Sequence, residues 1–336
     1  MMSDIQGNRQ ARRRFYILML LVLIALGFSL FVGRYPRPYW MPPTYLWKDD
    51  LARKLVLNLR LPRILTAFLL GTALATSGTV MQMIFRNPLV SPGFLGVSQG
   101  AGFGAAFAIL FLGHSAFLIQ VSAATFAFSG LLLSYFLAQH IRSGEWTLRL
   151  VLAGIAISAL FSSGVGLLKY LADPLQELPE IVFWMLGGLW ASTWDDLLII
   201  LPVTTMSLVI LYLMRWRLNL LSLRDETVFS LGAAPARERT LILVAAVAAT
   251  ASVVAVAGVV GWIGLIIPHI ARRLVGADAQ RTIPASMLLG GLFALLCDNL
   301  ARTLLAGEIP LGIITSLLGA FIFIVMLSSK TVEVTK

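Results

Sequence analysis

Charged residues are scarce in this sequence, and cysteine is nearly absent. Only 12% of the 336 residues are charged, whereas soluble domains carry about 25%, and 58% are hydrophobic. This composition excludes an ordinary soluble domain. The one cysteine, Cys297, cannot form an intrachain disulfide, and no cluster of cysteine and histidine has the spacing of zinc ligands.

Motifs that bind nucleotides or nucleic acids are missing as well. No stretch matches the Walker A pattern GxxxxGK[ST], so the chain does not hold ATP by that route. The net charge of +10 has a simpler source than nucleic-acid binding, because Lys and Arg accumulate on the cytoplasmic side of membrane proteins. No basic recognition helix or aromatic stacking platform accompanies it. An intramembrane enzyme would need HExxH or a paired nucleophile and base, and we find neither.

Long apolar runs fill most of the chain. A membrane-crossing helix needs about 20 mainly apolar residues, and this rule predicts an all-α membrane protein of about ten transmembrane helices in a single domain, residues 1–336. The predicted spans lie near 15–33, 63–84, 93–112, 115–139, 148–171, 194–214, 238–257, 259–275, 283–305 and 309–328. The eighth is short and rich in Gly and Pro. The first has a longer apolar stretch than a signal peptide, so we expect it to be retained.

An even number of spans places both termini on one side of the membrane. Most of the 26 basic residues lie in the loops and tails of that side, which predicts cytoplasmic termini. The segment 34–63, on the opposite side, is the exception because it is also basic. Its Trp and Tyr residues are typical of a segment that lies at the membrane interface.

The polar segment 215–239 separates two spans and falls on the predicted cytoplasmic side. Ser222 is a suitable N-cap with Asp225 completing a capping box, Gly232 suits the residue after a helix, and Pro235 prevents its continuation. Apolar residues recur at helical spacing at Leu220, Leu223, Val228 and Leu231. The pattern fits either a helix packed on the bundle or a helix that docks in a groove of a cytoplasmic partner.

Two charged residues lie inside a predicted span. Asp298 and Arg302 are four residues apart and share one helix face. Charge within the membrane usually marks function, and an ion-coupled secondary transporter would need such a carboxylate. The proximity of Arg302 instead favours a structural ion pair near the outer end of the span.

Four motifs, in this order and spacing, resemble one family over nearly the whole chain, from about Leu59 to Leu327. They are RLPR (60–63), RNPL (86–89), GWIGLIIPHIAR (261–272) and EIPLG (308–312). They are similar to the permease subunit of ABC importers for iron chelates, haem and vitamin B12. The resemblance implies the BtuC-like fold of type II ABC importers in a bacterial or archaeal inner membrane.

The resemblance also implies partners. Such permeases pair with a second membrane subunit, here expected to be an identical copy, and receive substrate from a periplasmic or lipid-anchored binding protein. Two cytosolic ATPase subunits drive them and bind the ATP and Mg. The chain itself is therefore expected to be no enzyme and to hold no cofactor.

By the same resemblance, the segment Leu220–Gly232 docks into the ATPase. Its expected coupling residues are Leu220, Leu223, Arg224, Asp225, Glu226, Ser230, Leu231 and Gly232. Arg224 stands where the family commonly has a small residue, and Val228 and Phe229 are bulkier than usual, which places exchange of the partner ATPase in doubt.

The resemblance further implies two gates and a substrate pathway. Cytoplasmic gate residues are Asn87, Pro88, Leu89 and Thr147, and a periplasmic gate helix over 179–190 contains Trp184, Gly187 and Gly188. Close packing and turn geometry explain these Gly and Pro residues equally well. The pathway candidates are Ser98, Gln99, Ser158, Ser162, Thr315 and Ser316, although small polar residues also form hydrogen bonds between packed helices.

The expected substrate is a metal chelate, either a ferric siderophore or haem. Cobalamin and an oxyanion such as molybdate or tungstate are alternatives within the same fold. A secondary ion-coupled transporter is the alternative class.

Overall fold

A computed structural model describes residues 2–36, 39–141, 144–223, 225–230, 232 and 234–328. These residues form a helical bundle with one two-stranded antiparallel ribbon, β1 (Val32–Gly33) paired with β2 (Tyr39–Trp40). Before the first interior helix come α1 (Met2–Phe31), α2 (Tyr45–Lys48), α3 (Asp50–Leu55) and the π-helix η1 (Val56–Arg60). The next helices are α4 (Leu61–Ile84), the 3₁₀ helix η2 (Pro92–Leu95), α5 (Val97–Phe111), α6 (Ala116–His140), α7 (Trp146–Leu171) and α8 (Glu177–Leu186). The chain continues through α9 (Trp194–Leu213), α10 (Arg215–Leu221), α11 (Asp225–Ser230), α12 (Pro235–Ala257), α13 (Ile263–Val275), α14 (Ala279–Thr303) and α15 (Leu311–Ser328).

The all-α membrane fold predicted from the sequence is confirmed. Eight helical stretches among the described residues are long and apolar enough to cross a membrane. The spans predicted at 93–112 and 259–275 form the shorter helices α5 and α13. Both are shortened at their start, where η2 precedes α5 and an irregular stretch over 258–262 precedes α13. Irregular backbone at membrane depth requires surrounding protein.

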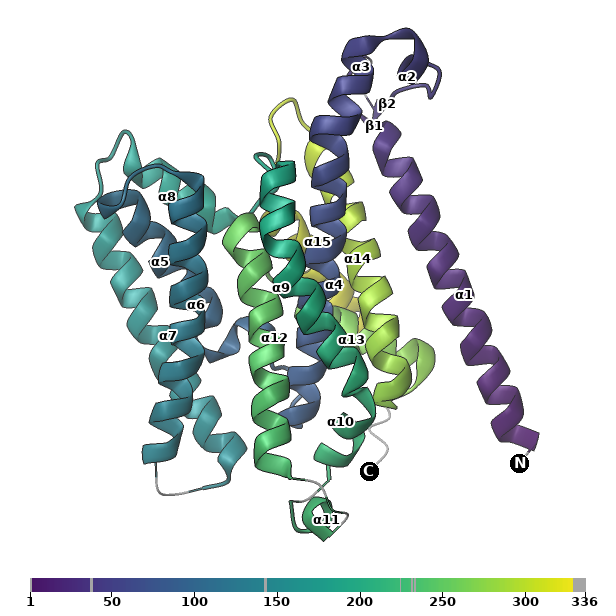
Figure 1. Cartoon of the computed structure of the whole chain (residues 1–336), viewed down its shortest axis with the longest axis vertical. Helices are drawn as coiled ribbons and strands as arrows, with labels where there is room; N and C mark the ends of the chain where they lie inside the picture. Colours follow the sequence, from purple (N-terminus) through teal and green to yellow (C-terminus); the bar gives the residue numbers. More distant parts are fainter. Residues whose placement is uncertain are drawn as a thin grey trace.

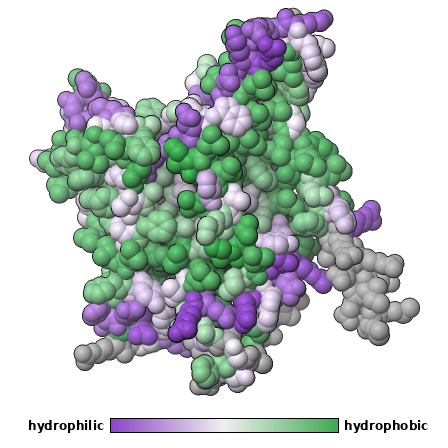
Figure 2. All heavy atoms as spheres, viewed as in Figure 1, coloured by the Kyte–Doolittle hydropathy of each residue, from purple (hydrophilic) through white to green (hydrophobic). Residues whose placement is uncertain are grey.

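Hydrophobic side chains cover the middle of the visible face, and hydrophilic side chains gather at its two ends (Figure 2). We call these the α8 end, where α2, α3 and α8 lie, and the α11 end, where α10 and α11 lie (Figure 1). Helix α1 begins at the α11 end, and α15 begins beside α8. The apolar band between two polar ends is the pattern that a bilayer requires.

Helix α4 occupies the interior and packs against α9, α12, α13 and α14. Two glycines on α4 permit these close contacts. A Cβ on Gly71 would overlap the backbone of Gly290, and one on Gly78 would overlap the backbone of Gly264. Small residues let helices in membranes approach to backbone contact.

A second group of helices, α5, α6 and α7, packs together by the same means. Gly100 and Gly104, four residues apart on α5, lie against the backbone of α6 at Phe126 and Ser122. Helix α12 contacts α5 and α6 on one side and α4 and α9 on the other (Figure 1). The bundle therefore consists of two glycine-packed groups joined through α12.

The polar segment 215–239 differs from its prediction as a single capped helix. It forms α10 and α11, and Ser222 is the C-cap of α10 rather than an N-cap, with its hydroxyl donating to the Asn219 carbonyl at 2.7 Å. Gly232 has the left-handed φ of +76° expected after a helix, and Pro235 begins α12. Among the expected coupling residues, Arg224 and Leu231 lie outside the described residues, as do the side chains of Asp225 and Glu226.

Candidate functional site

The α11 end presents a short helix with apolar side chains of two kinds. Val228 is fully buried, whereas the adjacent Phe229 is 72% exposed and Leu223 is 43% exposed. Ser230 and Gly232 are also exposed, and Leu220 is half-buried. An aromatic ring exposed beside a polar segment is a suitable anchor for a partner's pocket.

Helix α10 attaches this segment to the bundle. Leu218 and Leu221 are fully buried. The Asn219 side chain donates to the Asp278 carboxylate at 2.7 Å and accepts from the Ala279 backbone amide at 2.9 Å, so it ties α10 to the start of α14. The polar segment is therefore linked through α10 to a helix that crosses the bundle.

The loop after α4 contains the expected gate residues Asn87, Pro88 and Leu89, all exposed. Arg86 begins it with a left-handed φ of 48°. The Arg86 and Asn87 amides donate to the Met83 and Gln82 carbonyls at 3.3 and 3.1 Å, which is the Schellman termination of a helix.

The same loop contacts the segment Leu220–Gly232, which is the expected docking segment. The Arg86 guanidinium donates to the Leu223 carbonyl, between α10 and α11. Thr147, the other expected cytoplasmic gate residue, is half-buried in the first turn of α7. The α11 end thus brings the expected gate loop into direct contact with the expected docking segment.

At the opposite end, the last turn of α8 is held by backbone contacts. The Gly188 amide donates to the Ala257 carbonyl at 2.8 Å, and the Gly312 amide donates to the Gly187 carbonyl at 3.3 Å. A Cβ on Gly258 would overlap the Trp184 carbonyl, and one on Gly312 would overlap the Leu186 carbonyl. Gly187 and Gly188 thus lie in close backbone contact with neighbouring segments in this conformation, and their role in a gate stays a prediction.

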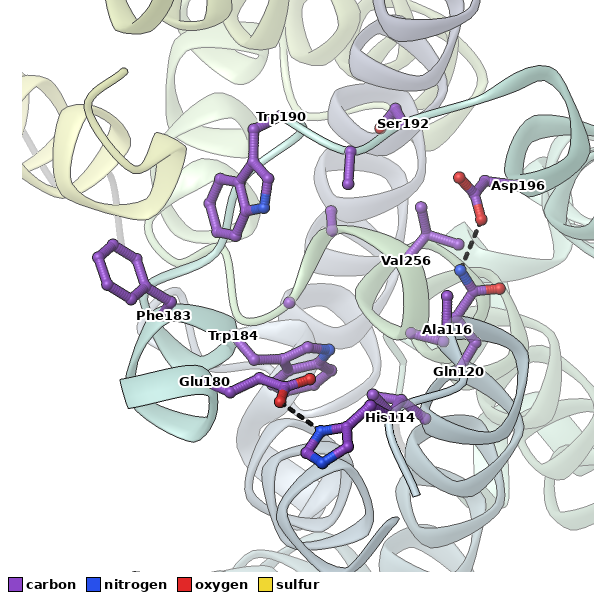
Figure 3. A pocket seen from close by; sticks show the side chains of 16 residues that line it. His114, Ala116, Gln120, Glu180, Phe183, Trp184, Trp190, Ser192, Asp196 and Val256 are labelled. Carbon is purple, nitrogen blue, oxygen red and sulfur yellow. Dashed lines mark hydrogen bonds and ion pairs between the residues drawn. The ribbon is translucent and has the colours of Figure 1, made fainter. Parts of the chain in front are cut away.

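A cavity of about 270 Å³ lies beside α8 (Figure 3). Its walls carry the aromatic side chains of Phe183, Trp184 and Trp190. The His114 Nδ1 atom lies 2.8 Å from the Glu180 carboxylate, which joins the loop after α5 to α8. The Gln120 amide donates to the Asp196 carboxylate at 2.6 Å, which joins α6 to α9. Among the described residues, no cluster of three or more His, Cys, Asp or Glu side chains could hold a metal ion.

The predicted Asp298–Arg302 pair belongs to a larger network. The two side chains are 3.7 Å apart, but Arg63 is the closer partner, with its Nε atom donating to Asp298 at 2.9 Å. Arg63 also contacts the Glu308 carboxylate at 2.8 Å. Arg63 and Glu308 were not predicted as partners of Asp298, although they lie in the motifs RLPR and EIPLG.

A basic cavity of about 320 Å³ adjoins this network at the α8 end. Arg34, Arg60, Arg63 and Arg302 line it together with Glu308. Arg60 donates to the Leu30 and Tyr35 carbonyls, each at 3.0 Å, which fixes its guanidinium below the β1–β2 ribbon. The cavity therefore has more cationic than anionic groups and is suited to acidic side chains.

The expected pathway residues differ in their exposure to solvent. Ser98, Gln99, Ser158 and Ser316 are half-buried, and Ser162 is exposed on α7. Thr315 is completely buried, and its hydroxyl donates to the Gly312 carbonyl at 3.2 Å. This hydrogen bond lies in the first turn of α15, and the place of these residues on a substrate path stays a prediction.

Comparison with known proteins extends over nearly the whole chain. The molybdate import system permease protein MolB of Haemophilus influenzae is 41% identical over 91% of this chain and 92% of its own length. A Helicobacter pylori permease protein assigned to an iron chelatin transport system is 42% identical over 81% of this chain and 82% of its own length. A solved structure described as an inward-facing conformation of a transporter assigned to the metal-chelate type of ABC transporter matches with a TM-score of 0.87. It is 40% identical in sequence and covers 94% of this chain and 99% of its own.

A family model matches as well, over residues 19–329. That model is the FecCD transport family, whose relatives here are ABC permeases for several solutes. This match agrees with the helical bundle, with the polar segment at the α11 end and with the network of Arg63, Asp298 and Glu308 at the α8 end. The chain belongs to the FecCD transport family of ABC importer permeases.

Proposed function

We propose that this chain is the membrane subunit that carries a metal chelate, a ferric siderophore or haem, into the cytoplasm. The α11 end faces the cytoplasm and binds the ATPase, and the α8 end receives the binding protein. The observation that carries the proposal is the contact between Arg86 of the gate loop and Leu223 of the docking segment. Through this contact, movement of a bound ATPase reaches the gate.

The basic cavity at the α8 end supports the binding-protein part of the proposal. Arg34 and Arg60 line it at the β1–β2 ribbon, and Glu308 adjoins them. Electrostatic complementarity increases association rates and fixes orientation. The expected partner surface therefore carries acidic side chains.

The buried network supports an ATP-driven importer over an ion-coupled carrier. Asp298 is 1% exposed and is paired with both Arg63 and Arg302. A carboxylate that binds and releases an ion in each cycle needs access to solvent, whereas this one is held by two cations. Energy is expected to come from the ATPase.

The proposed transport cycle uses two copies of the chain. The exposed face of α7, with Ser162, lines the path between the copies, and closure of the ATPases switches the gates by rigid-body rearrangement. Binding by weak contacts suits this task, because release of the substrate is part of each turnover.

The test is uptake into proteoliposomes that contain this chain, its ATPase and its binding protein. Ferric hydroxamate, haem, cyanocobalamin and molybdate are supplied in separate experiments with ATP inside. We expect ATP-dependent uptake of ferric hydroxamate or haem. Uptake by the chain without the ATPase would overturn the proposed function, and uptake of cyanocobalamin alone would overturn the proposed substrate.

Molybdate is the second candidate substrate. The relative MolB, at 41% identity, belongs to a molybdate import system. If molybdate alone is taken up in the same experiment, the substrate is an oxyanion rather than a metal chelate, and the proposed transport mechanism is unchanged.

A further inference from the structure

Arg239 is a buried cation at the α11 end. It lies in the second turn of α12 and is only 5% exposed. Its Nη2 atom donates to the carbonyl of Leu221, the last residue of α10, at 3.1 Å. A buried guanidinium needs such partners, because a charge removed from water without compensation is strongly unfavourable. The end of α10 and the start of α12 are thereby joined.

The Arg239 guanidinium also faces an aromatic ring. Its Cζ atom is 5.8 Å from the ring centroid of Trp146, within the range of a cation–π interaction. Trp146 is the first residue of α7 and precedes the expected gate residue Thr147. The guanidinium therefore connects the start of the docking segment, at Leu221, with the first turn of α7, which contains the expected gate residue Thr147.

Trp146 continues the connection to the other cytoplasmic gate segment, the loop after α4. Its ring stacks on Phe85, with centroids 6.4 Å apart and planes inclined by 12°, a favourable offset arrangement. Phe85 is the C-cap of α4 and immediately precedes the gate loop. Since Arg86 donates to the Leu223 carbonyl, the contacts form a closed circuit from α10 through α12, α7 and α4 back to the docking segment.

We propose that Arg239 and Trp146 are positioning residues that make both cytoplasmic gate segments follow the docking segment. This inference rests on the proposed function of that segment. When the ATPase displaces α10, the Leu221 carbonyl moves, Arg239 keeps its hydrogen bond, and the stacked rings move with it. In this role, neither residue needs to contact the substrate or ATP. Their loss leaves the ATPase bound and active while the gates respond poorly.

The experiment measures uptake and ATP hydrolysis in the same proteoliposomes, and ATPase binding by co-purification. For Arg239→Gln we expect normal ATPase binding and hydrolysis, with uptake per ATP about tenfold lower, the factor for one lost charged hydrogen bond. Trp146→Leu, which leaves the Arg239–Leu221 hydrogen bond available, is expected to act similarly. Trp146→Phe retains an aromatic ring and is expected to recover most of the uptake per ATP.

Arg237→Gln is the matched control, because Arg237 is exposed on the same helix and carries the same charge. We expect it to retain wild-type uptake per ATP. The double variant Arg239→Gln/Trp146→Leu should lose no more than either single variant, since both changes open the same circuit. Multiplied losses, or wild-type uptake per ATP in Trp146→Leu, would overturn the inference. Absence of ATP-dependent uptake in the wild-type complex would instead overturn the proposed function.

Discussion

The Arg63 guanidinium donates to the Asp298 carboxylate across 235 positions of sequence, joining the start of α4 to the last turns of α14. Asp298 accepts this bond at 2.9 Å while Arg302 lies 3.7 Å from its other oxygen. The same Arg63 reaches Glu308, which lies just before α15. One side chain thus fixes the α8 ends of two helices and the loop that leads to a third.

Loss of the Asp298 charge is expected to destabilise the fold. In Asp298→Asn, two buried cations lose their shared partner, and breaking a buried ion pair in this way costs about 3–5 kcal/mol. Thermal unfolding of the purified protein in detergent measures the effect. The control is Arg53→Gln, which breaks an exposed pair with Asp50 and should cost less than about 1 kcal/mol. Equal unfolding temperatures for the two variants would contradict the structural role of Asp298.

Phe229→Ala is expected to weaken ATPase binding without destabilising the permease. The ring is 72% exposed, and truncation of an aromatic anchor costs about 2 kcal/mol, or about thirtyfold in affinity. Titration of the detergent-solubilised permease with the ATPase measures this. Val228→Ala is the matched variant, because Val228 is buried and its truncation should lower the unfolding temperature. Wild-type affinity of Phe229→Ala would exclude the ring from the interface.

The backbone junction at α8 is expected to reject even one methyl group. In Gly258→Ala the new Cβ overlaps the Trp184 carbonyl, and φ at this position is +67°. Overpacking of this kind costs about 1–3 kcal/mol, and displacement of α8 should also reduce uptake. Gly307→Ala is the control, because its Cβ meets open space. Its free energy of unfolding should lie within about 0.5 kcal/mol of the wild-type value. If both alanine variants transport normally, the junction does not control the gate.

Arg86 offers a way to separate turn stability from coupling. Arg86→Gly suits the left-handed φ of 48° and should be about 1 kcal/mol more stable than Arg86→Ala. Both variants lack the guanidinium that donates to Leu223, so both should show reduced uptake per ATP. Unfolding in detergent and the proteoliposome assay give the two quantities. If uptake per ATP is normal in Arg86→Gly and reduced in Arg86→Ala, the loss of uptake comes from the strained turn and not from the missing guanidinium.

Much of the fold could be predicted from the sequence because apolar length and helix-capping patterns act within one segment. The spans and the polar segment 215–239 are of this kind. The helical repeat also placed Arg302 beside Asp298, four residues away. It could not place Arg63 there, because a partner 235 residues distant depends on how α4 and α14 pack.

The candidate site was predicted less completely for the same reason. Family motifs indicated the gate loop and the docking segment, but the contact of Arg86 with a backbone carbonyl has no sequence pattern. Arg239 and Trp146 lie outside the four sequence motifs, so no pattern indicated them. Ser222 was misplaced because a serine that satisfies a capping pattern can also end the preceding helix, and here its hydroxyl bonds back to Asn219.

The glycine contacts within each helix group have a mechanical consequence. Where Gly71 touches Gly290 and Gly100 touches Phe126, backbone meets backbone, and no rotamer change can absorb a sliding movement. Each group should therefore keep its internal geometry throughout the cycle. Movement between the two groups then occurs along the sides of α12. A crosslink that joins the two groups across α12 should therefore arrest transport, whereas a crosslink between two helices of the same group should not.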